Sequence, residues 1–264
     1  MFDRYRPLIA LGLLLPAQAA VAHDPVFGLG PHVLYKGGVE IAPQADRRRA
    51  GNGGQDELAL ELTYGLTGDW AIGIDSGYAN PRAGGRGADD PALFSKYRFW
   101  RNDMPGAQES AAVLLKVKPD SGAAAGTGSN DAILGLTYGY ESRRWYRWAS
   151  LRYRYNGEDD DGLQRGGRWL VDFVGGIRPT PTGYLEPDTV WLLELNGEIT
   201  RQAQLKGDGL PGTGGTEWFL SPGLFWTYRN FAVKAGVQIP VLGDLNGAQD
   251  DSDYRARLVL EWHL

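Results

Sequence analysis

The residues of this sequence that could do chemistry are pairs of like charge spaced two or four positions apart. The basic pairs are Lys96 and Arg98, Lys116 and Lys118, Arg152 and Arg154, and Arg255 and Arg257; the acidic pairs are Glu57 and Glu61, and Glu194 and Glu198. On a β-strand this spacing places both side chains on the same face. Such faces can bind polar solutes or form ion pairs with facing strands, and two carboxylates can do acid–base chemistry.

The composition excludes several classes of protein. The chain has 264 residues, no Cys and a net charge of −5. Without Cys there is no disulfide, thiol nucleophile or Cys-ligated metal, and the mild acidity offers no basic surface for nucleic acid. No apolar run outside the N-terminus is long enough for a membrane helix. The 38 Gly, about twice the usual share, favour short strands and turns.

Residues 1–22 are predicted to be a signal peptide. Basic residues precede the apolar run Leu8–Leu15, which is too short to span a bilayer. Ala20–Ala22 has the small residues of a cleavage site. The mature chain would then begin at His23 and act outside the cytoplasm.

The rest of the chain alternates between strand-like and turn-rich runs. Twelve strands are predicted, near 38–48, 57–66, 70–79, 92–101, 109–118, 131–141, 145–155, 168–178, 189–200, 217–228, 231–241 and 253–264. Most are about ten residues long, as a tilted transmembrane strand needs. Apolar and polar residues alternate along them; in 57–66, for example, four Leu and Tyr64 alternate with Glu57 and Glu61. One face of each strand should therefore meet an apolar medium and the other water.

The predicted connections alternate in length. Shorter ones fall near 67–69, 102–108, 142–144, 179–188 and 229–230, and longer ones near 49–56, 80–91, 119–130, 156–167, 201–216 and 242–252. Short periplasmic turns and long external loops are typical of outer-membrane barrels. The predicted fold is thus all-β, a monomeric transmembrane antiparallel up-and-down β-barrel at 38–264, preceded by a periplasmic N-terminal segment at 23–37. A soluble sandwich or lipocalin-like barrel is the alternative.

Aromatic residues favour the membrane barrel. They gather at the predicted strand ends, where they would form the girdles of the two bilayer interfaces: Tyr64, Trp70, Tyr78, Trp100, Tyr140, Trp145, Tyr155, Trp169, Trp191, Trp218, Trp226, Tyr228, Phe231 and Trp262. The final strand resembles the signal read by the barrel-assembly machinery, although it ends in Leu264 rather than Phe. We expect an outer-membrane location in a Gram-negative-type cell, with outer-membrane lipid and lipopolysaccharide as partners.

If the apolar faces meet lipid, the charged faces line the lumen. The predicted lining residues are Glu57, Glu61, Asp75, Lys96, Arg98, Lys116, Lys118, Arg152, Arg154, Asp172, Glu194, Glu198, Arg255, Arg257 and Glu261. They could close a narrow interior with ion pairs, or hold a transverse field across a porin-like open pore; the open pore is favoured. Trp148, Phe219 and Phe225 would also face inward. They could pack inside the barrel or contact an aromatic solute, but register slips or bulges are the favoured explanation for them.

The N-terminal segment is predicted to plug the barrel mouth. Its Pro25 and Pro31 exclude a regular helix, and Phe27, Leu29 and Val33 are apolar enough to tuck inside. With the signal before it and the barrel pattern after it, this segment resembles outer-membrane transporter proteins grouped with the phenol-degradation meta-pathway family. The resemblance implies a transporter, for some members near genes of aromatic degradation or metal handling, and defines no catalytic residues.

Metal and enzyme sites are minor hypotheses. After cleavage His23 would offer an α-amine and an imidazole to Cu(II), with His32 as a further ligand. A Ser–His pair would need His263 beside Ser150 or Ser221, and the motifs G-x-S-x-G, H-E-x-x-H and the Walker loop are absent from the sequence.

The predicted function is passive passage of a small-molecule solute, aromatic or metal-related, with no enzyme activity, no cofactor and no nucleic-acid partner. The alternatives are a closed structural barrel that binds a ligand or lipopolysaccharide and, less favoured, a lipid-modifying barrel enzyme.

Overall fold

The computed structural model describes residues 24–80, 85–183 and 185–264. The regular structure of these residues consists of β-strands. No helix among them is long and apolar enough to cross a membrane.

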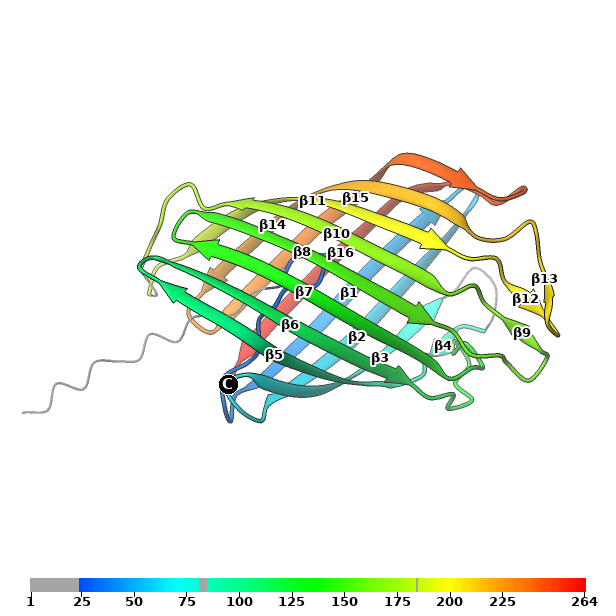
Figure 1. Cartoon of the computed structure of the whole chain (residues 1–264), viewed down its shortest axis with the longest axis horizontal. Helices are drawn as coiled ribbons and strands as arrows, with labels where there is room; N and C mark the ends of the chain where they lie inside the picture. Colours follow the sequence, from blue (N-terminus) through cyan, green and yellow to red (C-terminus); the bar gives the residue numbers. More distant parts are fainter. Residues whose placement is uncertain (1–23, 81–84, 184) are drawn as a thin grey trace, which may run out of the picture.

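Twelve long strands form one closed antiparallel barrel (Figure 1). They are β1 (Val39–Ala50), β2 (Gly53–Gly65), β3 (Trp70–Asn80), β5 (Ala92–Met104), β6 (Ala107–Lys118), β7 (Asp131–Ser142), β8 (Trp145–Tyr155), β10 (Arg168–Ile177), β11 (Asp188–Thr200), β14 (Gly215–Tyr228), β15 (Phe231–Leu245) and β16 (Ser252–His263). Each strand pairs with its sequence neighbours, and β16 pairs with β1 to close the ring. Closure is required because lipid cannot satisfy an unpaired strand edge.

The two ends of the barrel differ. The turns β5–β6, β7–β8 and β14–β15 lie together at one end, where the C-terminus also lies (Figure 1). The opposite end carries longer loops with the short strands β4 (Gly87–Ala88), β9 (Leu163–Gln164), β12 (Gln204–Leu205) and β13 (Asp208–Gly209). By the usual orientation of such barrels, the short-turn end is periplasmic and the loop end is external.

The predicted long loop at 49–56 is wrong. β1 and β2 continue to pair until Ala50 lies opposite Gly53, which leaves a two-residue turn in which Gly51 has a φ of 51°. The polar run suggested a loop because it lacks an apolar face. Instead it extends the hairpin, and an ion pair of 2.7 Å between Arg47 and Asp56 joins the two strands.

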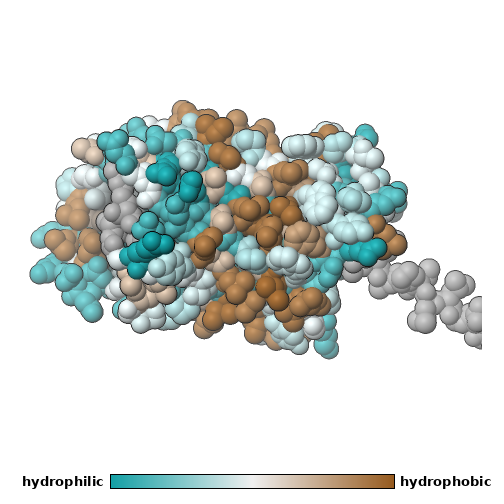
Figure 2. Space-filling view, turned by 180° about the vertical axis from the view of Figure 1, so that it is seen from behind, coloured by the Kyte–Doolittle hydropathy of each residue, from teal (hydrophilic) through white to brown (hydrophobic). Residues whose placement is uncertain are grey.

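The outer wall is apolar. Leu58, Leu134 and Trp191 are 65%, 63% and 56% exposed on it, and Figure 2 shows hydrophobic side chains gathered over the middle of the barrel. Aromatic side chains such as Trp70, Trp145 and Tyr155 are exposed near the strand ends. An apolar surface of this extent needs hydrocarbon around it, with the aromatic rings at its boundaries.

The interior contains large aromatic side chains, against the favoured prediction of a register slip. Trp148, Phe219 and Phe225 are 5%, 0% and 4% exposed and lie inside the barrel. A register shift does occur between Trp218 and Phe219, but Phe219 still points inward. Trp148 and Phe225 belong to a buried cluster with Val26 and Phe27 of the N-terminal segment. The inward-facing aromatic side chains of the wall therefore pack against apolar side chains of this segment.

The outward orientation of Leu136, at the middle of β7, can be tested. Leu136→Arg should lower the free energy of unfolding by about 2–4 kcal/mol, because a cation at the bilayer midplane is costly on a lipid-facing wall. Urea unfolding in phospholipid vesicles measures this. The matched control is Leu205→Arg in β12 among the external loops, which should change the stability little. Equal effects of the two substitutions would contradict the assigned membrane band.

Candidate functional site

The charged residues predicted for the lumen face the interior. Those that line its cavities are Glu57, Glu61, Asp75, Lys96, Lys116, Lys118, Arg154, Arg257 and Glu261. Those that are buried or ion-paired inside the wall are Arg98, Arg152, Asp172, Glu194, Glu198 and Arg255. Arg98 lies at the periplasmic mouth, where it binds Asp69 at 2.7 Å and the carbonyl of Gly68.

Most lumen cations are paired with acids. The pairs are Lys96–Asp24, Lys116–Asp75, Lys118–Asp90, Lys118–Asp131, Arg152–Asp172, Arg168–Glu198, Lys234–Glu261, Arg255–Glu198, Arg255–Glu217 and Arg257–Asp46. Glu198 on β11 reaches Arg255 on β16, with β14 and β15 between them in the ring. The lumen is therefore crossed by ion pairs as well as lined by them.

Glu194 anchors the N-terminal segment, residues 24–38, inside the barrel. Its fully buried carboxylate accepts hydrogen bonds from the backbone N–H groups of Val26 at 2.7 Å, Phe27 at 3.2 Å and Gly28 at 2.9 Å. Asn196 donates a further hydrogen bond at 3.3 Å. Because an isolated buried carboxylate is costly, these donors explain how Glu194 is accommodated in the wall.

Other wall residues bind the backbone carbonyls of the same segment. Arg257 donates to Val26 at 3.2 Å, Arg152 donates to Phe27 at 3.2 Å and Thr137 donates to Leu29 at 2.7 Å. Pro25 and Pro31 prevent this segment from satisfying its own backbone as a helix. The wall supplies the missing hydrogen-bond partners instead, so the groups of the lumen are complementary to the backbone of the segment.

A glycine in the wall leaves room for the segment. At Gly65 a Cβ atom would lie 2.0 Å from the carbonyl oxygen of Tyr35. Backbone hydrogen bonds join Gly37 to Gly65 and Gly65 to Gly38 at the same place. The sequence does not show that the N-terminal segment runs past this glycine, so the contact could not be predicted.

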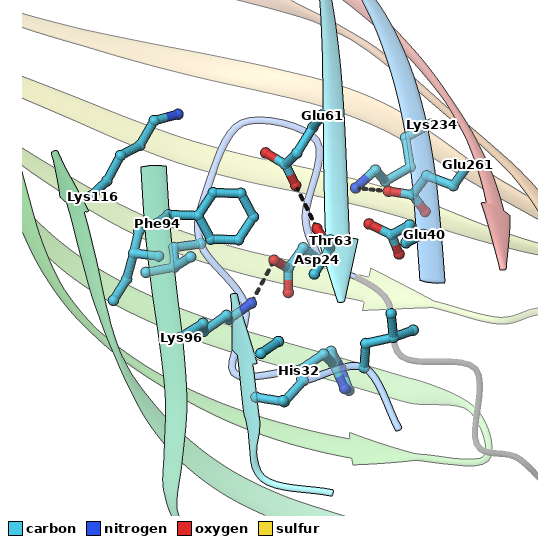
Figure 3. Close-up of a pocket in the computed structure, with 15 residues that line it drawn as sticks. Asp24, His32, Glu40, Glu61, Thr63, Phe94, Lys96, Lys116, Lys234 and Glu261 are labelled. Carbon is cyan, nitrogen blue, oxygen red and sulfur yellow. Dashed lines mark hydrogen bonds and ion pairs between the residues drawn. The ribbon is translucent and has the colours of Figure 1, made fainter. Parts of the chain in front are cut away.

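Two cavities lie in series along the lumen. The lower one, about 170 Å³, is lined on one side by the N-terminal segment and on the other by wall residues that include Glu61, Lys96 and Lys116 (Figure 3). The upper one, about 810 Å³, extends towards the external loops. Glu61 and Lys116 line both cavities, so the two spaces meet there, beside the segment.

The buried carboxylate of Asp90 holds external loops over the upper cavity. Asp90 accepts hydrogen bonds from the N–H and hydroxyl of Ser121, from the N–H of Thr127 and from Lys118. Burial raises the pKa of Asp90, but these hydrogen bonds outweigh it and lower the pKa to about 2. Asp90 is therefore a charged clamp between residues 85–91 and the loop 119–130.

The metal hypothesis for His23 and His32 is not tested by the described residues. His23 lies outside the described residues, and His32 is buried against Glu141. Elsewhere, possible ligand atoms of Glu40, Glu261 and His263 lie within 4.8 Å of one another. Lys234 already binds Glu261 there, and His263 contacts Glu40 at 2.7 Å, so both carboxylates already have partners.

The serines considered for catalysis have other partners. Ser221 donates to Asn196 at 2.6 Å, and Ser150 donates to Asp172 at 2.6 Å. Both hydroxyls thus belong to the hydrogen-bond network around Glu194 and Asp172.

This geometry can be set against known proteins. A family described as "Putative MetA-pathway of phenol degradation" matches residues 66–241. The chain belongs to this family. No curated protein matches it significantly.

Solved structures share its fold. The crystal structure of the COG4313 outer membrane channel from Pseudomonas putida F1 is similar over 89% of this chain and 98% of that one, with 12% identity and a TM-score of 0.65. The NanC porin is similar over 85% of this chain and 100% of that one, with 10% identity and a TM-score of 0.55. The closed ring, the apolar wall and this shared fold show that this family member is an outer-membrane β-barrel, as predicted.

The anchoring role of Glu194 can be measured by hydrogen exchange. Glu194→Ala leaves three buried N–H groups without their acceptor, so exchange at residues 26–28 should rise by about tenfold or more while the barrel stays folded. Glu186→Ala, in an exposed periplasmic turn, is the control. Unchanged protection in Glu194→Ala would contradict the anchor.

The Asp90 clamp predicts a pH dependence. Because folding lowers the pKa of this carboxyl from 3.8 to about 2, its contribution is complete above about pH 4 and is lost as the pH falls through about 2. Asp90→Ala should loosen residues 121–127 at neutral pH, with exchange raised about tenfold or more. Asp160→Ala, an exposed acid in the neighbouring external loop, should not; if both variants behave alike, the clamp is absent.

Proposed function

We propose that the chain is a passive channel for small solutes in the outer membrane. The observation that carries this proposal is the pair of cavities that meet at Glu61 and Lys116. The path they define runs along β2, β3, β5 and β6 and passes beside the N-terminal segment. Its polar lining would replace part of the hydration shell of a solute, as in other pores.

The N-terminal segment would act as the constriction of this channel. It fills the periplasmic part of the lumen, and the cavity beside it is about 170 Å³ against about 810 Å³ above it. Solutes would collect in the wide external part and pass the narrow part slowly. The segment need not leave the barrel for ions to pass, since the lower cavity already lies beside it.

The solute class suggested by the family description is phenol or a related aromatic compound. The lower cavity offers one aromatic wall residue, Phe94. Trp148 and Phe225 are instead covered by Val26 and Phe27, so an aromatic solute would meet them only if the segment moved. We therefore propose small solutes in general and regard aromatic compounds as one group among them.

A closed barrel that binds a ligand or lipopolysaccharide is the second candidate. The ion pair between Glu198 and Arg255 across the lumen favours it. The two candidates differ in conductance, because a closed barrel carries no current whatever its loops bind.

Export and assembly complete the proposal. A signal peptide at 1–22 would direct export, and cleavage would leave the segment from His23 to enter the barrel. The barrel-assembly machinery would recognise β16 before it pairs with β1, and outer-membrane lipid and lipopolysaccharide would surround the finished wall.

Deletion of residues 23–36 should raise the single-channel conductance, because it removes the constriction and merges the two cavities. The measurement compares full-length mature and deleted proteins in planar bilayers. The deleted protein must still show heat-modifiable migration as evidence of a folded barrel. An unaltered conductance would contradict the constricting role.

Lys116→Glu should shift selectivity towards cations. The substitution would place a third carboxylate beside Glu61 and Asp75 where the cavities meet, which favours cations electrostatically. The reversal potential under a KCl gradient measures this. Lys206→Glu in the exposed β12–β13 turn should leave the reversal potential near its wild-type value, and the same value in both variants would place the permeation path elsewhere.

A further inference from the structure

Two lumen arginines stand apart from the pairing of cations with acids. Within the described part of the chain, no ion pair joins Arg48 or Arg154 to an acid, whereas the neighbouring Arg168, Arg255 and Arg257 are all paired. Arg48 and Arg154 line the upper cavity, and both side chains are exposed to it. Among the lumen-facing cations of the described strands, these are the two arginines without an ion pair to an acid.

The two arginines come from opposite walls of the barrel. Arg48 is on β1 and Arg154 is on β8, and in the ring five strands separate β1 from β8 in either direction. The two guanidinium groups are nevertheless close enough to interact electrostatically. They therefore face each other across the upper cavity, where a solute that enters from the loop end would pass between them.

Each member of this pair has further arginines as neighbours. In the strand register Arg48 lies opposite Arg255, and Arg154 lies opposite Arg168. Glu198 is shared by Arg255 at 2.5 Å and Arg168 at 2.8 Å.

The other acids near the pair do not bond to it; Asp131, within electrostatic reach of Arg154, is paired with Lys118 at 3.2 Å. Asp46 is engaged by Arg257 at 2.8 Å. Glu57 is within electrostatic reach of Arg48 without a bond to it. Two like charges within electrostatic reach repel each other, and an anion between them would relieve that repulsion.

We propose that Arg48 and Arg154 form a binding site for the carboxylate group of a small organic anion. This inference rests on the proposed channel function and names its solute class. The planar guanidinium fork matches a carboxylate with two parallel hydrogen bonds, and two forks from opposite walls can hold both oxygens. Ala132, Ile133 and Leu163 line the same cavity and give the hydrocarbon part of such an anion an apolar surface.

Binding of benzoate to the folded, detergent-solubilised full chain tests the site without requiring conduction. Saturation-transfer NMR titrations measure the apparent Kd of benzoate and of benzyl alcohol, its uncharged analogue. We expect benzoate to bind more tightly than benzyl alcohol. Loss of both guanidinium groups in the double variant Arg48→Gln, Arg154→Gln should weaken benzoate binding by about tenfold or more.

The matched control is the double variant Arg47→Gln, Arg147→Gln. These arginines are exposed on the same two strands as the tested ones but do not line the cavities, so the benzoate affinity should stay within about twofold of wild type. Equal affinities for benzoate and benzyl alcohol, or equal losses in the two double variants, would overturn the site.

Competition with sulfate tests the chemical class. Displacement of benzoate by sulfate at equal concentration would show a general oxyanion site and overturn the assignment to organic carboxylates. The binding result is separable from the channel proposal. A barrel that binds benzoate through these arginines but never conducts would refute the channel and keep the site, and a conducting barrel that ignores benzoate would do the reverse.

Discussion

The structure depends on the constraint that no backbone N–H or C=O group can face hydrocarbon unpaired. This constraint explains why β16 must pair with β1 and why the chain needs a complete ring. It also divides every strand into a lipid face and a lumen face. Successive residues point to opposite faces, so the position of a residue along its strand decides whether it meets lipid or the lumen. The apolar wall and the charged interior are two consequences of the same rule.

The same rule operates inside the lumen. The N-terminal segment contains two prolines and cannot satisfy its backbone alone, so the wall provides Glu194 for its N–H groups and Arg152, Arg257 and Thr137 for its carbonyls. Because Glu194 and Thr137 are buried and polar, their hydrogen bonds to the segment also satisfy the wall. The barrel and the segment therefore form one unit, and the space left over is the pair of cavities.

Much of this arrangement could be predicted from the sequence, because alternation and turn chemistry are local. The strand count and the closed barrel follow from the alternating runs and the turns between them. The inward orientation of residues such as Lys116 and Glu198 follows from their odd or even position along the strand. The hairpin at 47–56 could not be predicted, since polar residues outside the bilayer pair without an apolar face. Nor could the role of Glu194 or the freedom of Arg48, because both depend on which groups meet across the ring, and spacing along one strand does not contain that information.

The central claim is that the lumen conducts. Single-channel recording of the full-length mature protein in a planar bilayer, under a salt gradient, tests it most directly. The account predicts small discrete current steps with a defined reversal potential, as expected for a narrow charged path beside the N-terminal segment. A folded, heat-modifiable barrel that inserts into the bilayer and never produces current steps would contradict it.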